Sequence, residues 1–272
     1  QKKFSQALFG NDYPYANTNK ASDYDSLSRD LFVDFHKENY NPAKSKIIIS
    51  GSYSDNTKLL LEKYFGDSCT DNVVKSLSEF TINSDKTRTH FVEKKDALQS
   101  AVRVGRLTIN RDHPDFHGLN ILVTILGGYF GSRLMSNIRE DKGYTYGIGS
   151  TIITFPNAAY FLVATETGNE FCRAALNEIY YEMEKLQNEP VGEEELETVK
   201  NYLLGETLRS IDGVFALSGT FKSMLLMNND FSNYAEFLKV LRDIKPEDLQ
   251  KLAVKYLEVH KMYEVVAGKE KP

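Results

Sequence analysis

The order of strand-like and helix-like segments after residue 89 constrains this chain more than any other feature of its sequence. Two strand patterns come first, a helical stretch follows, a second strand pair turns at Pro156 and Asn157, and a long helical region leads to one last strand. Strands joined by short connections pair antiparallel, and the intervening helices must cover a face of the sheet. We therefore predict an α+β fold, with helices packed on one face of a mostly antiparallel sheet. The predicted strands are residues 89–94, 100–109, 146–155, 158–165 and 262–267, and the predicted helices are 112–126, 132–140, 170–187, 193–209, 214–227, 234–241 and 246–256.

Residues 1–68 lack the elements that a complete layer of this kind needs. Their pattern predicts a helix over 23–40, a buried strand over 46–50 and a second helix over 55–65. One strand between two helices cannot form a covered sheet, so we interpret this stretch as the truncated end of a related first domain. Residues 69–88 are polar and rich in Ser, Thr, Asp, Asn and Lys, which predicts an interdomain linker. Residues 89–272 then form a complete second domain.

Charge and cysteine usage exclude several classes of function. Lys and Arg number 33 against 38 Asp and Glu, so the formal net charge is −5 and a basic surface for nucleic acid is not expected. No apolar run approaches the roughly 18 residues of a membrane-spanning helix. Cys69 and Cys172 are far apart and predict neither a disulfide framework nor a zinc–cysteine cluster. We expect a soluble protein with no nucleic-acid partner and no membrane span, in a bacterial-type cytoplasm or periplasm, between which the sequence does not distinguish.

His113 and His117 are spaced as H-x-x-x-H, which can hold zinc when both imidazoles share one helix face. Pro114 favours the first helical position, so His113 lies outside the helix and the two rings diverge. The glutamate that follows the first histidine in H-E-x-x-H is also missing. We therefore predict no metal site in this chain. The motifs of phosphate loops, dinucleotide-binding turns and nucleophile elbows do not occur in the sequence either.

The segment LGGYFGSRLMSNIREDKGYTY, residues 126–146, combines a glycine-rich turn, a short helix ended by Gly143 and the start of a strand. Arg139 lies in the last turn of that helix, and Tyr146 lies on the strand. A helix end beside a strand start can bring a guanidinium and a phenol to one rim of the fold. The residues alone favour a structural interpretation, in which Arg139 complements the helix C-terminus and Tyr146 is a half-buried strand residue.

The same segment resembles the signature of the second, non-zinc domain of the pitrilysin/insulinase-like metallopeptidases, whose relatives include the mitochondrial processing peptidase. Residues 13–15, 35–42 and 47–51 resemble the end of the first domain in that family. Residues 190–209 resemble its P-x-x-x-E-E-L-x-x-x-K helix. The resemblance spans essentially the whole chain.

The resemblance implies where zinc and substrate residues are found. The family holds zinc by H-x-x-E-H and a downstream Glu in the first domain, and this motif does not occur here. The chain would be the C-terminal part of a subunit whose zinc motif lies upstream or on a partner chain, so zinc is expected only in the complete enzyme. An Arg and a Tyr seven positions apart reach the substrate in the family, which selects Arg139 and Tyr146, and not Tyr144, as catalytic residues. The glycine-rich loop near the substrate corresponds to Gly127, Gly128, Gly131 and Ser132, although these glycines can equally serve to end one helix and begin the next.

The implied function is a part of a zinc-dependent endopeptidase that is inactive by itself. A phenol and a guanidinium can stabilise the negative charge that develops on a peptide carbonyl oxygen during hydrolysis. Substrates would be short or unfolded peptides, bound extended along a sheet edge and enclosed in a homo- or heterodimer with a zinc-bearing chain. The alternative is a non-enzymatic structural or partner subunit of the same fold. A more remote alternative is an enzyme of this fold that acts on small molecules.

Overall fold

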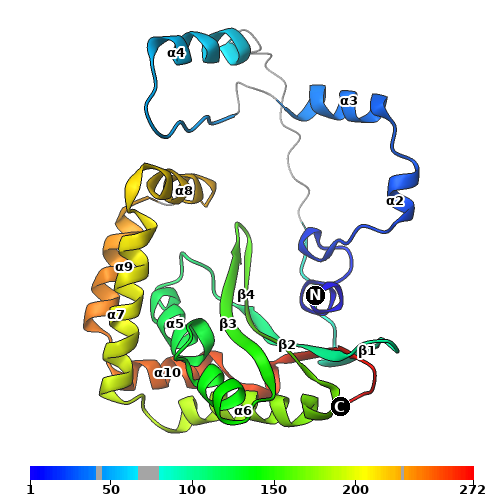
Figure 1. The fold of residues 1–272 in the computed structure, drawn as a ribbon, viewed down its shortest axis with the longest axis vertical. Coiled ribbons are helices and arrows are strands. Elements are labelled where there is room, and N and C mark those ends of the chain that lie inside the picture. Colours follow the sequence, from blue (N-terminus) through cyan, green and yellow to red (C-terminus); the bar gives the residue numbers. More distant parts are fainter. Residues whose placement is uncertain (41–44, 67–79, 228–229) are drawn as a thin grey trace.

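The computed structural model describes residues 1–40, 45–66, 80–227 and 230–272. Within these residues five strands form one sheet in the order β1-β5-β2-β4-β3 (Figure 1). β1 runs parallel to β5, and the other neighbouring strands are antiparallel. The predicted α+β fold with a mostly antiparallel sheet is thereby confirmed. The strands are β1 (Thr89–Glu93), β2 (Gln99–Thr108), β3 (Thr145–Phe155), β4 (Ala158–Gly168) and β5 (Tyr263–Gly268).

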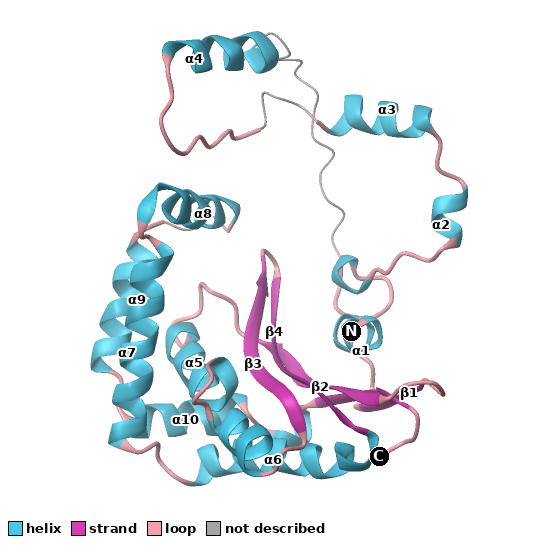
Figure 2. Cartoon of the chain, in the orientation of Figure 1, coloured by secondary structure: helices cyan, strands magenta, loops and turns pink. Residues whose placement is uncertain are grey.

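The main hydrophobic core lies between one face of this sheet and the helices packed on it (Figure 2). Val102 and Val104 alternate along β2 and are fully buried, as the period-two pattern of the sequence predicts. Leu122 and Ile179, also fully buried, enter the same cluster from two helices. The helices on this face are α5 (Phe116–Val123), α6 (Cys172–Asn188) and α10 (Pro246–Tyr256).

Three more helices form an arm beside this core. α7 and α9 run side by side, and α8 lies across their end (Figure 1). None of the helices in the described part of the chain is long and apolar enough to cross a lipid bilayer. Their bounds are α7 (Glu193–Ser210), α8 (Gly213–Leu226) and α9 (Ser232–Asp243).

The opposite face of the sheet is covered by α1 (Lys2–Phe9), a helix that the sequence analysis did not predict. Phe4 and Phe9 are buried there, and each ring contacts Tyr160 of β4 edge to face at a centroid distance of 5.9 Å. One helix of the stretch interpreted as the end of a first domain therefore packs on the sheet that residues 89–268 form.

After the short turn η1 (Pro14–Ala16), which packs with α1, the chain forms helices that lie away from the sheet (Figure 1). The helix predicted over residues 23–40 is divided into two, and the one predicted over 55–65 ends in a π-helical turn. None of the residues in these helices is buried. They are α2 (Ser22–Asp25), α3 (Arg29–Asn39) and α4 (Asp55–Leu61), with the π-helical turn at Glu62–Gly66.

The strand predicted over residues 46–50 is wrong. These residues are irregular, and Ile47 and Ile49 are 50% and 45% exposed. A strand needs a neighbour to pair with its N–H and C=O groups, and within the described residues no strand pairs with this segment. Most of the predicted linker, residues 67–79, lies outside the described residues, and residues 80–88 reach β1 without forming a helix or strand.

The accessible surface of the molecule is large for its mass. It amounts to 17,143 Å², whereas a compact monomer of 30.9 kDa exposes about 12,000 Å². Apolar residues contribute to this surface: Phe32 and Phe35 on α3 are 59% and 58% exposed, and Leu59 on α4 is 62% exposed. The helical spacing of these residues is typical of a buried face, but no part of the described chain covers them.

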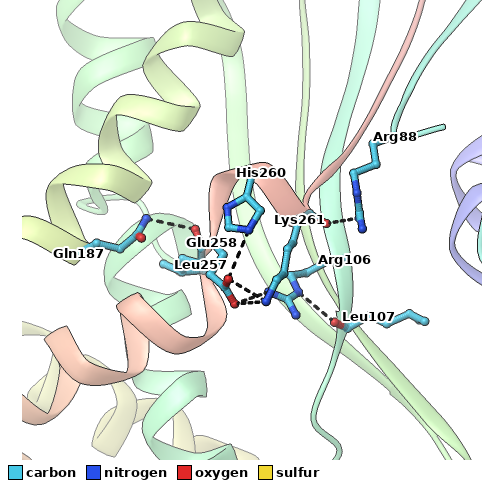
Figure 3. A network of polar contacts seen from close by, with 8 residues as sticks. All are labelled: Arg88, Arg106, Leu107, Gln187, Leu257, Glu258, His260 and Lys261. Atoms are coloured by element: carbon cyan, nitrogen blue, oxygen red, sulfur yellow. Dashed lines mark hydrogen bonds and ion pairs between the residues drawn. The ribbon is translucent and has the colours of Figure 1, made fainter. Parts of the chain in front are cut away.

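The connection from α10 into β5 is held by polar contacts around Glu258 (Figure 3). The Glu258 Oε2 lies 2.7 Å from Lys261 Nζ, and its Oε1 lies 3.5 Å from Nη1 of Arg106 on β2. The hydrogen bond from Lys261 lowers the pKa of Glu258. Arg88 donates to the Lys261 carbonyl at 2.7 Å. These contacts join the residues before β5 to the start of β1 and to β2, the two strands between which β5 lies.

Candidate functional site

Gly127 brings the end of the α5 region against the edge strand β3. It is buried in η4 (Thr124–Gly128), a π-helical turn that continues α5. A Cβ atom at this position would lie 2.7 Å from the main-chain nitrogen of Ser150, closer than packed atoms allow. The buried Ser150 hydroxyl donates to the Val123 carbonyl at 2.7 Å. Close packing therefore explains why position 127 is a glycine, and contact with a ligand is not needed to explain it.

Of the other residues assigned to substrate binding, Gly128 ends η4, and Gly131 and Ser132 lie between η4 and η5 (Met135–Asp141). Gly128 and Gly131 are exposed. Ser132 is 1% exposed, and its hydroxyl has no hydrogen-bond partner within the residues that the structure describes. A ligand could therefore reach the main chain at Gly128 and Gly131 but not the Ser132 hydroxyl.

Polar contacts hold η5 against α6 and hold Arg133, just before η5, against α7. Arg133 makes two parallel hydrogen bonds of 2.8 Å to the Glu195 carboxylate on α7. The Asn137 amide donates to Glu178 and Glu182 on α6, at 3.0 and 2.7 Å. Bidentate Arg–carboxylate pairs are directional as well as strong. The start and middle of this helical segment are therefore held in a defined position.

Arg139 lies in the last turn of η5, at the surface. Its guanidinium carbon is 4.8 Å from the centre of the Phe130 ring, and its Nη1 is 3.2 Å from Glu140 Oε1. The side chain is 33% exposed. Gly143, at φ +66°, adopts the left-handed conformation that ends a helix, as the sequence predicts. Arg139 thus combines a cation–π contact with donor groups that remain open to solvent.

Tyr146 lies on β3, the edge strand, at a β-bulge. Tyr146 and Gly147 both oppose the single residue Glu166 on β4. A bulge bends its strand and redirects the side chains within it. The Tyr146 side chain is 91% exposed, so it is not the half-buried strand residue of the structural interpretation. Tyr144, by contrast, stacks on Phe171 at a ring distance of 5.0 Å.

Arg139 and Tyr146 lie on either side of the turn at Gly143, which joins η5 to β3. In the described part of the chain, no hydrogen bond or ring contact joins their two side chains. The fold thus brings the predicted pair to one junction but not into contact. A half-exposed guanidinium and an exposed phenol at such a junction can both donate hydrogen bonds to an oxygen of a bound ligand.

Two charged residues that the sequence analysis missed lie beside Tyr146. Arg103 of β2 and Glu166 of β4 line a pocket of about 260 Å³ together with Tyr146. The Arg103 Nη1 donates to the carbonyls of Val102 and Thr165, at 2.8 and 3.2 Å. The signal was present in the predicted strand 100–109, where Arg103 alternates with buried valines and must point to the other face of the sheet.

The described residues contain no group of three or more His, Cys, Asp or Glu side chains that could bind a metal ion. His113 Nδ1 accepts a hydrogen bond from the Asp115 main chain at 3.0 Å. His117 is buried beside Phe237, and this burial lowers its pKa. The zinc implied by the resemblance therefore has no fitting ligand set in the described part of this chain.

Known proteins resemble this chain over most of its length. A family model described as the peptidase M16 inactive domain matches residues 26–203. YmxG of Bacillus subtilis, an uncharacterized zinc protease, is 24% identical over 227 residues, which are 82% of this chain and 54% of that protein. YmfF of the same organism, described as a probable inactive metalloprotease, is 20% identical over 255 residues, 92% of this chain and 58% of that protein. The chain thus spans little more than half the length of these relatives.

Solved structures share the fold. A peptidase M16 inactive domain from Pseudomonas fluorescens superposes with a TM-score of 0.82 at 24% identity, covering 100% of this chain and 66% of that one. A protease from Helicobacter pylori superposes with a TM-score of 0.83 at 21% identity, covering 99% and 66%. The structures support the fold, and the family model covers more than half of the sequence. The chain belongs to the peptidase M16 family, in the part described as its inactive domain.

Proposed function

We propose that this chain is the substrate-side part of a peptidase, in which Arg139 and Tyr146 bind the peptide bond that is cleaved. Negative charge develops on the carbonyl oxygen of a peptide bond during hydrolysis. The Arg139 guanidinium and the Tyr146 hydroxyl would donate hydrogen bonds to this oxygen, and these bonds strengthen as the charge grows. The chain would contribute no zinc ligand. The metal expected in the complete enzyme would be held upstream in the same protein or on a partner chain.

The exposure of Tyr146 carries this proposal. A tyrosine on a strand is normally packed against its neighbours, because its ring buries a large apolar area. Tyr146 instead is 91% exposed at a bulge, with Arg139 across the adjoining turn. Bulges of this kind are over-represented beside active sites. Membership in a peptidase family supports the same proposal.

The substrate would be a short or unfolded peptide in an extended conformation. β3 is an edge strand, so one side of its main chain has no neighbouring strand within the described residues. An extended peptide can add to such an edge through main-chain hydrogen bonds. The carbonyl groups of a peptide bound along this edge would lie within reach of the Tyr146 hydroxyl.

Two variants of the complete protein test the proposal, assayed with its zinc-bearing segment or partner. Tyr146→Phe should lower kcat by about 10²–10³-fold, the usual cost of losing one donor to a developing oxyanion. Tyr144→Phe is the matched control and should change kcat far less, because that ring stacks on Phe171. Small and equal effects at both tyrosines, with unchanged thermal unfolding, would contradict the proposal.

A non-enzymatic partner subunit is the second candidate function. It is favoured by the similarity to YmfF, which is described as a probable inactive metalloprotease. The two candidates differ in whether an H-x-x-E-H motif occurs in the complete protein or in the product of the adjacent gene. Finding the motif in neither would support the non-enzymatic function.

We also propose that residues 1–68 are the end of a first domain and that residues 69–88 link it to the second. The exposed apolar faces of α3 and α4 support this division, since a sheet of the first domain would bury them. A homo- or heterodimer with a zinc-bearing chain would then enclose the peptide between two halves.

A further inference from the structure

The β-bulge that displays Tyr146 is held by side chains, not only by strand pairing. Thr145 pairs with Thr167 of β4, and Ile148 pairs with Thr165, so the main chain between them has one residue more than its partner strand. The extra residue leaves main-chain polar groups without their regular ladder partners. Such groups keep a defined position only if other hydrogen-bond partners hold them.

Two threonine hydroxyls supply those partners. Thr145 Oγ1 lies 2.6 Å from the Glu166 carbonyl and accepts from the Gly147 N–H at 3.1 Å. Thr165 Oγ1 lies 2.9 Å from Thr145 Oγ1 and 2.9 Å from the Gly147 carbonyl. Thr145 and Thr165 are 8% and 4% exposed, so water has little access to their hydroxyls. Both main-chain polar groups of Gly147 are thus bound by threonine side chains.

We infer that Thr145 and Thr165 are positioning residues for Tyr146. They hold the N–H and C=O groups of Gly147, the residue that follows Tyr146 in the bulge. The direction of the exposed phenol is thereby fixed through the main chain, although no hydrogen bond or ring contact holds its own side chain within the described residues. Without the hydroxyls, the N–H and C=O groups of Gly147 would lose the two partners that fix their directions, and the bulge would move along the strand or open. A shift by one residue would turn Tyr146 toward the other face of the sheet. This inference rests on the proposed function only for its catalytic consequence.

The position of Tyr146 can be measured without activity. The full-length protein carries 3-fluorotyrosine at position 146 alone, and its ¹⁹F resonance is recorded. Thr145→Val, which removes the hydroxyl and keeps the branched shape, should broaden, split or shift this resonance. Thr145→Ser, which keeps the hydroxyl, should restore it. Thr165→Val removes the second hydroxyl and serves if Thr145→Val does not fold.

Ser100→Ala is the matched control. Ser100 is fully buried on β2, and its hydroxyl donates to Asn169 Oδ1 at 2.8 Å. Its loss should lower the thermal stability to a similar extent, because a buried hydrogen bond is also removed, and should leave the resonance of residue 146 unchanged. A threonine variant that loses stability like this control but leaves the resonance unchanged would overturn the inference.

A double-mutant cycle tests the catalytic consequence in the complete enzyme. Thr145→Val should lower kcat by about tenfold with little change in KM, and should have almost no further effect in a Tyr146→Phe background. Equal effects of Thr145→Val in both backgrounds would show that it does not act through Tyr146. If Tyr146→Phe leaves kcat unchanged, the proposed function fails, and the ¹⁹F measurement still decides whether the threonines position Tyr146.

Discussion

Arg139 is the residue at which a structural and a functional role differ most in measurable outcome. If it only complements the end of η5, its replacement should cost a few tenths to about 1 kcal/mol of stability and leave turnover unchanged. Its guanidinium instead stacks on the exposed Phe130 ring and keeps donors open to solvent. Both features depend on a planar, multi-donor group that lysine lacks.

Arg139→Lys separates the two roles because it keeps the charge and changes the donor geometry. We expect the activity of the complete or reconstituted enzyme to fall at least about tenfold, with little change in melting temperature. Arg209→Lys is the control, since Arg209 also lies in the last turn of a helix and pairs with a glutamate at 2.8 Å. Wild-type turnover in Arg139→Lys would remove Arg139 from the site.

Gly127 is a second residue whose role the structure defines. Gly127→Ala would push a Cβ atom to 2.7 Å from the Ser150 main chain, so we expect a loss of about 1–3 kcal/mol in the free energy of unfolding. Gly205 is the control, because it is exposed within α7 and a Cβ atom there would meet no other atom. Gly205→Ala should stabilise by about 0.5–1 kcal/mol. Urea unfolding of both variants measures the difference, and equal effects would contradict the packing role.

At the scale of elements, Asp115 joins the start of α5 to the end of α10. Its Oδ2 accepts hydrogen bonds from Lys255 Nζ and the Tyr256 hydroxyl, both at 2.7 Å. The hydrogen bond from Lys255 contributes most to lowering the pKa of Asp115, and the bond from Tyr256 lowers it further. A carboxyl group with a lowered folded-state pKa stabilises the fold above its unfolded pKa of about 3.9, and this stabilisation is lost as the pH falls through the folded value.

Asp115→Asn should therefore lower the free energy of unfolding by about 1 kcal/mol at pH 7. The expected loss is this small because the side chain is partly exposed and water screens its charge. The difference from wild type should shrink as the pH falls below about 4. Asp96→Asn, in the exposed turn between β1 and β2, serves as a control and should have little effect at either pH. A penalty that does not change with pH would contradict the ionic origin of the contact.

At the scale of the whole molecule, the described residues contain no metal-binding group of three side chains, and α3 and α4 expose apolar faces. We expect this polypeptide alone to retain no stoichiometric zinc after dialysis and to cleave no peptide. The complete protein, or this chain with a zinc-bearing partner, is the comparison. Chelator-sensitive peptide cleavage by the isolated chain would contradict the expectation, as would zinc retained at one equivalent in metal analysis.

The sequence by itself determined the elements whose signals are local. Apolar alternation locates β2, and Pro246 at the first helical position sets α10, predicted over 246–256 and observed at Pro246–Tyr256. The helix predicted over 132–140 is observed over 133–141, but most of it, η5 (Met135–Asp141), is π-helical, which the sequence did not predict. The resemblance selected Arg139 and Tyr146, but it could not describe their surroundings.

Only the tertiary structure decided which of these local patterns have partners. The apolar run at residues 46–50 has the composition of a strand, but a strand forms only where another main chain can pair with it. The packing of α1 on the sheet depends on Tyr160, more than 150 residues away in the sequence. The display of Tyr146 depends on a bulge, and a bulge exists only as a mismatch between β3 and β4. Pairing and burial join residues that are distant in sequence, which is why local periodicity could not predict them.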